Sequence, residues 1–151
     1  MILMDDKAKN TDFLNKVYQN AKMAEASISY VTERAENSGF ISDLTMQKEQ
    51  YESISAKAAV ELENMSEKPK DNSAMSKMSV KTGTVINTLF DKTPDKIAEM
   101  MIQGSIMGVI DMTRTLKEYG DVPQNIKALG YELITAEENN AQRMKAYLGC
   151  F

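Results

Sequence analysis

The sequence has no histidine and no tryptophan, and only one cysteine and three prolines among 151 residues. The absence of histidine removes the commonest metal ligand and the commonest general base. The single cysteine, Cys150, has no second cysteine for an internal disulfide and no histidine to activate it as a nucleophile. The small number of prolines, with only seven glycines, leaves room for long helices. These shortages argue against nucleophilic catalysis and favour a helical protein.

Long apolar runs and clusters of basic residues are also missing. No stretch reaches the roughly 18 apolar residues that a membrane-spanning helix needs. The opening MILMDDKAKN lacks the basic start and the long apolar core of a signal peptide. The net charge is −4, and Lys and Arg are spread along the chain, whereas a nucleic-acid-binding protein gathers them on one surface. We therefore expect a cytoplasmic protein that binds neither membranes nor nucleic acid.

The apolar residues that are present recur at steps of three and four, the spacing of one face of an α-helix. The first such stripe consists of Leu14, Val17, Ala21, Ala24, Ile28, Val31 and Ala35. Turn signals separate the stripes. Gly39 is expected to end one helix, with Ser42 or Asp43 as the N-cap of the next. Thr93 and Pro94 are expected to begin a later helix as its N-cap and first residue.

This punctuation predicts four long helices and a shorter helical segment between the second and the third. The approximate ranges are 12–37, 42–66, 73–90, 94–119 and 123–148. The first and last connections are short, so each flanking pair should form an antiparallel hairpin. The long middle connection would let the chain travel back along the bundle before the third long helix begins. The sequence thus predicts a single all-α domain over residues 1–151.

The order of hairpin, helical crossover and hairpin resembles the ferritin-like four-helix bundle, the superfamily of rubrerythrin. The fragments NAKM (20–23) and IAEMMIQGSIMG (97–108) are similar to a small bacterial family of this fold whose di-metal site is degenerate. The resemblance covers nearly the whole chain in helix lengths and connections. It implies a ferritin-like bundle with the crossover between the second and third long helices. The alternative is a plain up-down bundle with an extra helix packed outside.

A ferritin-like fold implies a di-iron centre made of glutamates and two Glu-x-x-His pairs, and both pairs are broken here because histidine is absent. The remaining candidate ligands near the middle of the expected helices are Glu25, Glu52, Glu137 and Asn140. Carboxylate and amide oxygens suit a hard divalent cation. One interpretation is therefore a metal-binding or oxidoreductase protein that holds Fe or Mn on carboxylates.

Our preferred interpretation is that no cofactor is bound and that a polar layer replaces the di-iron centre. Lys48 would neutralise Glu25 or Glu137, and Tyr51 and Ser105 would complete a hydrogen-bonded layer. Buried charges have to be paired or bonded in this way. Such a layer would set the register of the helices and would carry no catalysis.

The segment EMMIQGSIMGVIDM (99–112) is apolar on nearly every side. Gly104 and Gly108 lie one helical turn apart, and each costs about 1 kcal/mol in a helix interior relative to alanine. Two such glycines suggest a neighbour that approaches closely. Met100 and Met107 add an adaptable apolar surface. Either the crossover segment or a second subunit should cover this helix, since a helix that is apolar all round is buried on most sides.

These observations favour a non-catalytic, oligomerising or partner-binding module, either a homo-oligomer or a protein with another protein partner. The contact would be formed by Met100, Gly104, Met107 and Gly108. A phosphate-binding loop is not indicated, because the glycines of GSIMG lie inside an expected helix. A third possibility is a small-ligand carrier that uses the space beside the two glycines.

Overall fold

The computed structural model describes residues 2–70 and 92–151, with side chains from residue 6 onward. The described residues form four α-helices followed by a short 3-10 helix. They are α1 (Ile2–Arg34), α2 (Ser38–Asn64), α4 (Pro94–Glu118), α5 (Gln124–Met144) and η1 (Lys145–Tyr147). The expected all-α bundle is therefore confirmed, with no strand in the described ranges. The expected crossover segment, 73–90, lies outside them.

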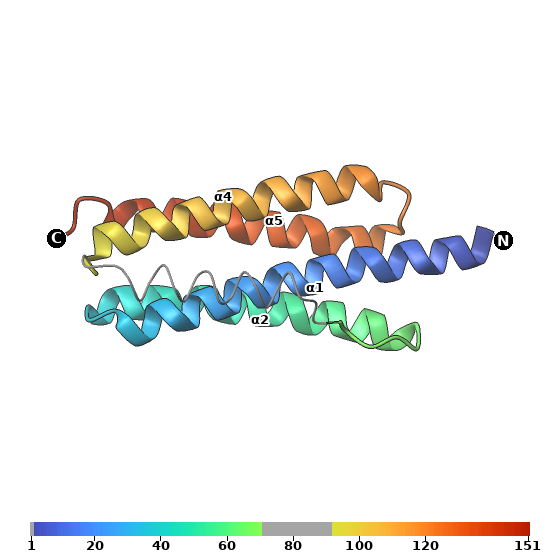
Figure 1. Ribbon diagram of the computed structural model, residues 1–151, viewed down its shortest axis with the longest axis horizontal. Coiled ribbons are helices and arrows are strands. Elements are labelled where there is room, and N and C mark those ends of the chain that lie inside the picture. Colours follow the sequence, from blue (N-terminus) through green and yellow to red (C-terminus); the bar gives the residue numbers. More distant parts are fainter. Residues whose placement is uncertain (1, 71–91) are drawn as a thin grey trace.

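The helices pack as two antiparallel hairpins, α1 with α2 and α4 with α5 (Figure 1). The hairpins join mainly through α2 and α5, with smaller contacts from α1 to α4 and α5. At one end of the bundle, the ring of Phe13 on α1 meets that of Tyr119 edge to face, with centroids 6.3 Å apart. At the other end, the rings of Phe40 and Tyr147 lie 4.5 Å apart. Aromatic pairs thus fasten the two hairpins at both ends.

Helices α2 and α4 run in the same direction (Figure 1). Near the start of α2, the Tyr147 hydroxyl donates to Asp43. At the same end of the bundle α4 begins, and the Asp95 amide donates to the carbonyl of Cys150 at 2.9 Å. Consecutive helices of a plain up-down bundle would run in opposite directions. The long connection between the hairpins therefore joins opposite ends of the bundle.

The starts of two helices differ from the prediction, and α5 ends at Met144 rather than near residue 148. Helix α1 begins at Ile2 rather than near residue 12. Residues 6–9 of its first turns are exposed, and Lys9 forms an ion pair of 2.7 Å with Asp121 in the connection that follows α4. The apolar stripe begins at Leu14, so it could not reveal the exposed residues 6–9. Helix α2 begins at Ser38, so Gly39 lies in its first turn and ends no helix.

The start of α2 is set by Asn37 rather than by Ser42 or Asp43. The Asn37 side-chain oxygen accepts a hydrogen bond of 2.9 Å from the Phe40 amide, which has no partner within the helix. Asp43 instead faces the end of α5. The predicted start of α4 is confirmed: the Thr93 hydroxyl accepts from the Lys96 amide at 3.3 Å, and Pro94 is the first helical residue.

The core lies along the axis of the bundle and is mostly aliphatic. Its fully buried large side chains include Leu14, Val17, Ile28, Leu44, Ile54, Leu62, Met112, Leu133 and Met144. All four helices contribute, as the three-and-four spacing of the sequence predicts. None of the described helices combines the length and apolar character that crossing a membrane requires.

Replacing Asn37 by alanine tests the cap. Asn37→Ala leaves the Phe40 amide without its acceptor, so we expect the free energy of unfolding to fall by about 1 kcal/mol in urea titrations. Ser42→Ala is the matched control, because Ser42 is exposed inside α2 and should lower stability little or not at all. An equal loss in both variants would contradict the assignment of the cap.

Candidate functional site: a polar cluster beneath a groove between α1 and α4

A buried carboxylate and a buried phenol meet at the middle of the bundle. The Tyr51 hydroxyl, on α2, donates to Oε1 of Glu137 on α5. Glu137 is 7% exposed and Tyr51 is 2% exposed. Burial raises the pKa of Glu137 to about 7, and the bond from Tyr51 opposes that rise. Burial and the adjacent carboxylate also raise the pKa of Tyr51, so this phenol remains a neutral donor at neutral pH.

Two further polar side chains lie beside this pair. Ser105 on α4 is 7% exposed and Asn140 on α5 is 1% exposed. Hydrogen bonding to both groups opposes the rise in the pKa of Tyr51. By geometry, however, neither side-chain atom of Asn140 is close enough and well enough aligned to bond any described residue. The Asn140 amide thus lies next to Tyr51 and is available to another polar group.

Gly108 makes the space that the Glu137 carboxylate occupies. A Cβ atom added at Gly108 would lie 2.8 Å from Cδ of Glu137, and closer still to Oε2. Gly104, one turn earlier on α4, has no described atom within 4 Å of such a Cβ. The expectation of a close neighbour thus holds for Gly108 and is wrong for Gly104 among the described residues. The neighbour of Gly108 is a carboxylate and not a helix backbone.

The polar pair reaches a groove of about 370 Å³ between α1 and α4. Tyr51 and Glu137 line it from the two helices on the opposite side of the bundle. The walls are largely methionine, glycine and small polar residues. Those from α1 include Asn20, Met23 and Ser27, and those from α4 include Met100, Met101, Gly104, Met107 and Gly108. The volume falls within the range of small-molecule sites.

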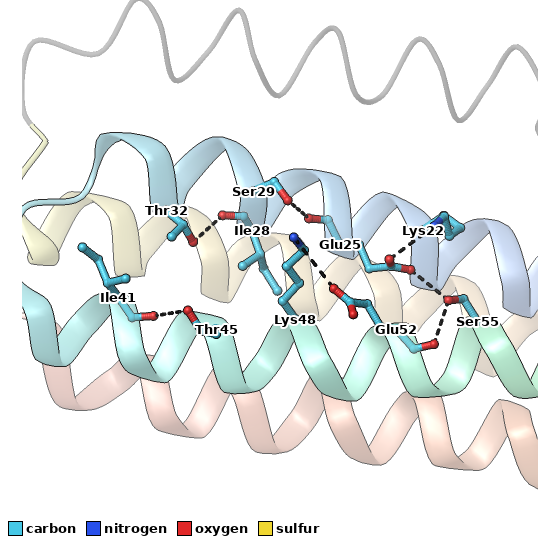
Figure 2. A network of polar contacts seen from close by, with 10 residues as sticks. All are labelled: Lys22, Glu25, Ile28, Ser29, Thr32, Ile41, Thr45, Lys48, Glu52 and Ser55. Carbon is cyan, nitrogen blue, oxygen red and sulfur yellow. Dashed lines mark hydrogen bonds and ion pairs between the residues drawn. The ribbon is translucent and has the colours of Figure 1, made fainter.

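Glu25 is held in a separate set of contacts (Figure 2). Its Oε2 accepts a 2.9 Å hydrogen bond from the Ser55 hydroxyl of α2, and its Oε1 lies 3.3 Å from Nζ of Lys22. Lys48 lies outside the polar layer that the sequence suggested. Its side chain is 39% exposed and forms a 3.8 Å ion pair with Glu52, one turn along α2. The expected pairing of Lys48 with Glu25 or Glu137 is therefore wrong.

The four candidate metal ligands do not gather into one set. Glu137 and Asn140 lie together beside Tyr51, whereas Glu25 is bonded to Ser55 and the Glu52 side chain is half exposed on the surface of α2. Within residues 2–70 and 92–151, no three His, Cys, Asp or Glu side chains are placed so as to hold a metal. The three carboxylates instead have three separate partners: Tyr51 for Glu137, Ser55 for Glu25 and Lys48 for Glu52.

Sequence reasoning missed two buried polar residues of α2. Ser55 is the donor to Glu25, and Gln47 is 2% exposed with no partner for its Nε2 among the described residues. Gln47 fills the gap between Leu44 and Tyr51 in the apolar stripe of α2, at the spacing of a buried position. This spacing could have predicted from the sequence that Gln47 is buried.

The chain matches no protein-family model, and the comparisons with curated proteins and with solved structures gave no match either. Its functional interpretation therefore depends on the geometry of the cluster, the groove and the surface.

The two glycines of α4 should respond in opposite ways to alanine. Gly108→Ala forces the Glu137 carboxylate away from its position and weakens the Tyr51 hydrogen bond, so we expect a loss of about 1–3 kcal/mol in the free energy of unfolding. Gly104→Ala meets open space and reduces the entropy of the unfolded chain, so we expect a gain of up to about 1 kcal/mol. Urea denaturation measures both. A similar change in the two variants would contradict the assignment of Gly108 to Glu137.

The pH dependence of stability should reveal the burial of Glu137. Its pKa is raised from 4.5 to about 7. The folded state therefore binds a proton more tightly than the unfolded state, and this contribution is fully present below pH 4.5 and lost as the pH rises to 7. The loss should reach about 3 kcal/mol relative to Glu137→Gln, which cannot titrate. Parallel stability curves for the two proteins from pH 4.5 to 8 would show that this carboxyl is not desolvated.

Proposed function

We propose that this protein is a non-catalytic helical module that acts by association, first with a second copy of itself and alternatively with another protein. The supporting observation lies on α4. Ile106, Met107 and Ile110 are exposed by 51%, 56% and 38%. They share one side of the helix, because residues three and four apart lie on the same face. The expectation that α4 is covered on most sides is not met by the described residues.

This α4 stripe, defined as Ile106, Met107 and Ile110, differs from the other exposed apolar side chains. Met46 and Val60 on α2 and Tyr131 on α5 are separate positions on other helices, and Leu148 and Phe151 follow the last helix. Single exposed apolar residues are ordinary, whereas a contiguous group indicates a contact surface. Methionine adds a side chain that adapts to a partner's shape. The stripe is therefore the surface we assign to association.

The interior supports a structural role over a catalytic one. Glu137 and Tyr51 bond to each other, and Glu25 bonds to Ser55. In this proposal the bundle is ferritin-like and cytoplasmic, and the polar cluster occupies the place of a di-iron centre. The common direction of α2 and α4 supports that architecture. A carboxylate-only Fe or Mn site has less support, because the Glu52 side chain is on the surface with Lys48.

Introducing a charge into the stripe tests the proposed association. Ile106→Glu and Met107→Glu each place a carboxylate in the contact, so we expect the mass in solution, measured by size exclusion with light scattering, to fall to that of a monomer. Val60→Glu is the matched control, since Val60 is 54% exposed on another helix and should leave the mass unchanged. A wild-type protein that is monomeric at high concentration would contradict self-association.

A further inference from the structure

We propose that the groove between α1 and α4 is a binding site for a small organic amine, with an apolar chain along the methionine walls and a protonated amino group at Glu137. The site is distinct from the α4 stripe in its chemistry, although Met107 belongs to both. It requires no association of the chain. It therefore goes beyond the function proposed above.

The charge of the site favours a cation. The acidic residues that line the groove are Glu137 from α5 and Asp111 from α4, and Tyr51 is the titratable residue from α2. The α1 lining has no ionisable side chain, and no Lys or Arg of the described chain lines the groove. The nearest lysine along α1, Lys22, pairs with Glu25. An anionic ligand would meet only like charge, whereas a cation would be attracted.

Glu137 has an oxygen to offer such a ligand. Its Oε1 accepts from Tyr51, but Oε2 receives no hydrogen bond from the described residues. Glu137 is only 7% exposed, and no basic side chain of the described chain forms an ion pair with it. A buried carboxylate is stable as an ion only when paired or bonded. An ammonium group would supply the missing charge and the missing donor together.

The neighbouring side chains can accept the other hydrogen bonds of an amino group. An ammonium has three N–H donors and no acceptor. Oε2 of Glu137 is one acceptor at the groove, whereas Asn140, beside Tyr51, is 1% exposed and does not line the groove. Ser105 lines the groove and adds a hydroxyl acceptor. The polar end of the groove thus offers acceptors from α4 and α5 to a single donor-rich group.

The methionines of the groove suit an unbranched apolar chain. Met23 of α1 and Met100 and Met101 of α4 line it, and flexible thioethers adapt to ligands of varied shape. The open space beside Gly104 lies along the same wall. Most small-molecule sites likewise combine an apolar lining with a few polar groups that orient the ligand.

Isothermal titration with three ligands of equal chain length tests the proposal. We expect octylamine to bind at pH 8 at least tenfold more tightly than octanol, and octanoate to bind most weakly. The affinity for octylamine should fall about tenfold per pH unit below pH 7, because protonated Glu137 no longer attracts the ammonium. Equal binding of octylamine and octanol, or no binding of any ligand, would overturn the proposal.

Two variants locate the site. Glu137→Gln should abolish the preference for octylamine over octanol while octanol still binds. Gly104→Phe should fill the groove and weaken all three ligands at least tenfold, and it remains informative if Glu137→Gln does not fold. Circular dichroism checks the helicity of each. Octylamine binding that is unchanged in Gly104→Phe would place the ligand elsewhere and overturn the assignment.

The Ile106→Glu variant separates this inference from the proposed association. Ile106 does not line the groove, so this variant should bind octylamine with the wild-type affinity, whatever its mass in solution. A loss of amine binding in Ile106→Glu with an intact groove would mean that the ligand binds at the subunit contact, which contradicts the proposed site.

Discussion

A carboxylate buried without a basic partner among the described residues is the constraint on which the centre of this bundle depends. Glu137 can stay in the core because Tyr51 donates to one oxygen and because Gly108 leaves room for the other. A side chain at position 108 would force the carboxylate out of place, so the backbone of α4 and the acid of α5 have to be considered together. Desolvation raises the pKa of Glu137 to about 7. Its ionisation near neutral pH therefore depends on any charged group that enters the groove. One buried acid thus takes part both in helix packing and in the proposed amine site.

Much of the fold could be predicted from the spacing of apolar residues. The stripes placed four long helices, and Thr93 and Pro94 marked the start of α4 correctly. The start of α2 was missed because Gly39 and Ser42 carry ordinary boundary signals, whereas the cap is decided by which side-chain oxygen reaches an unbonded amide. Here that oxygen belongs to Asn37. The beginning of α1 was missed because its exposed residues 6–9 carry no apolar stripe.

The spacing of apolar residues also predicted part of the candidate site. Tyr51, Ser105, Glu137 and Asn140 lie on or beside apolar stripes, and the structure buries all four. Lys48 and Glu52 flank the stripe of α2 on the side turned to solvent, while Gln47 occupies a buried position of the stripe itself. Spacing identifies the buried face but not the rotation of one helix against its neighbours. That rotation is set by packing across the bundle, so the partner of each flanking charge could not be assigned from sequence.

The most direct test of this account is the ionisation of Glu137 itself. The side-chain carboxyl ¹³C resonance of Glu137, assigned with Glu137→Gln and followed from pH 4 to 9, reports its pKa without a stability measurement. We expect a midpoint near 7, because the carboxyl is desolvated and lacks a basic partner in the described chain. A midpoint near the ordinary value of 4.5 would mean that water or a cation already stabilises the ion, and it would contradict the buried acid on which both the packing and the amine site depend.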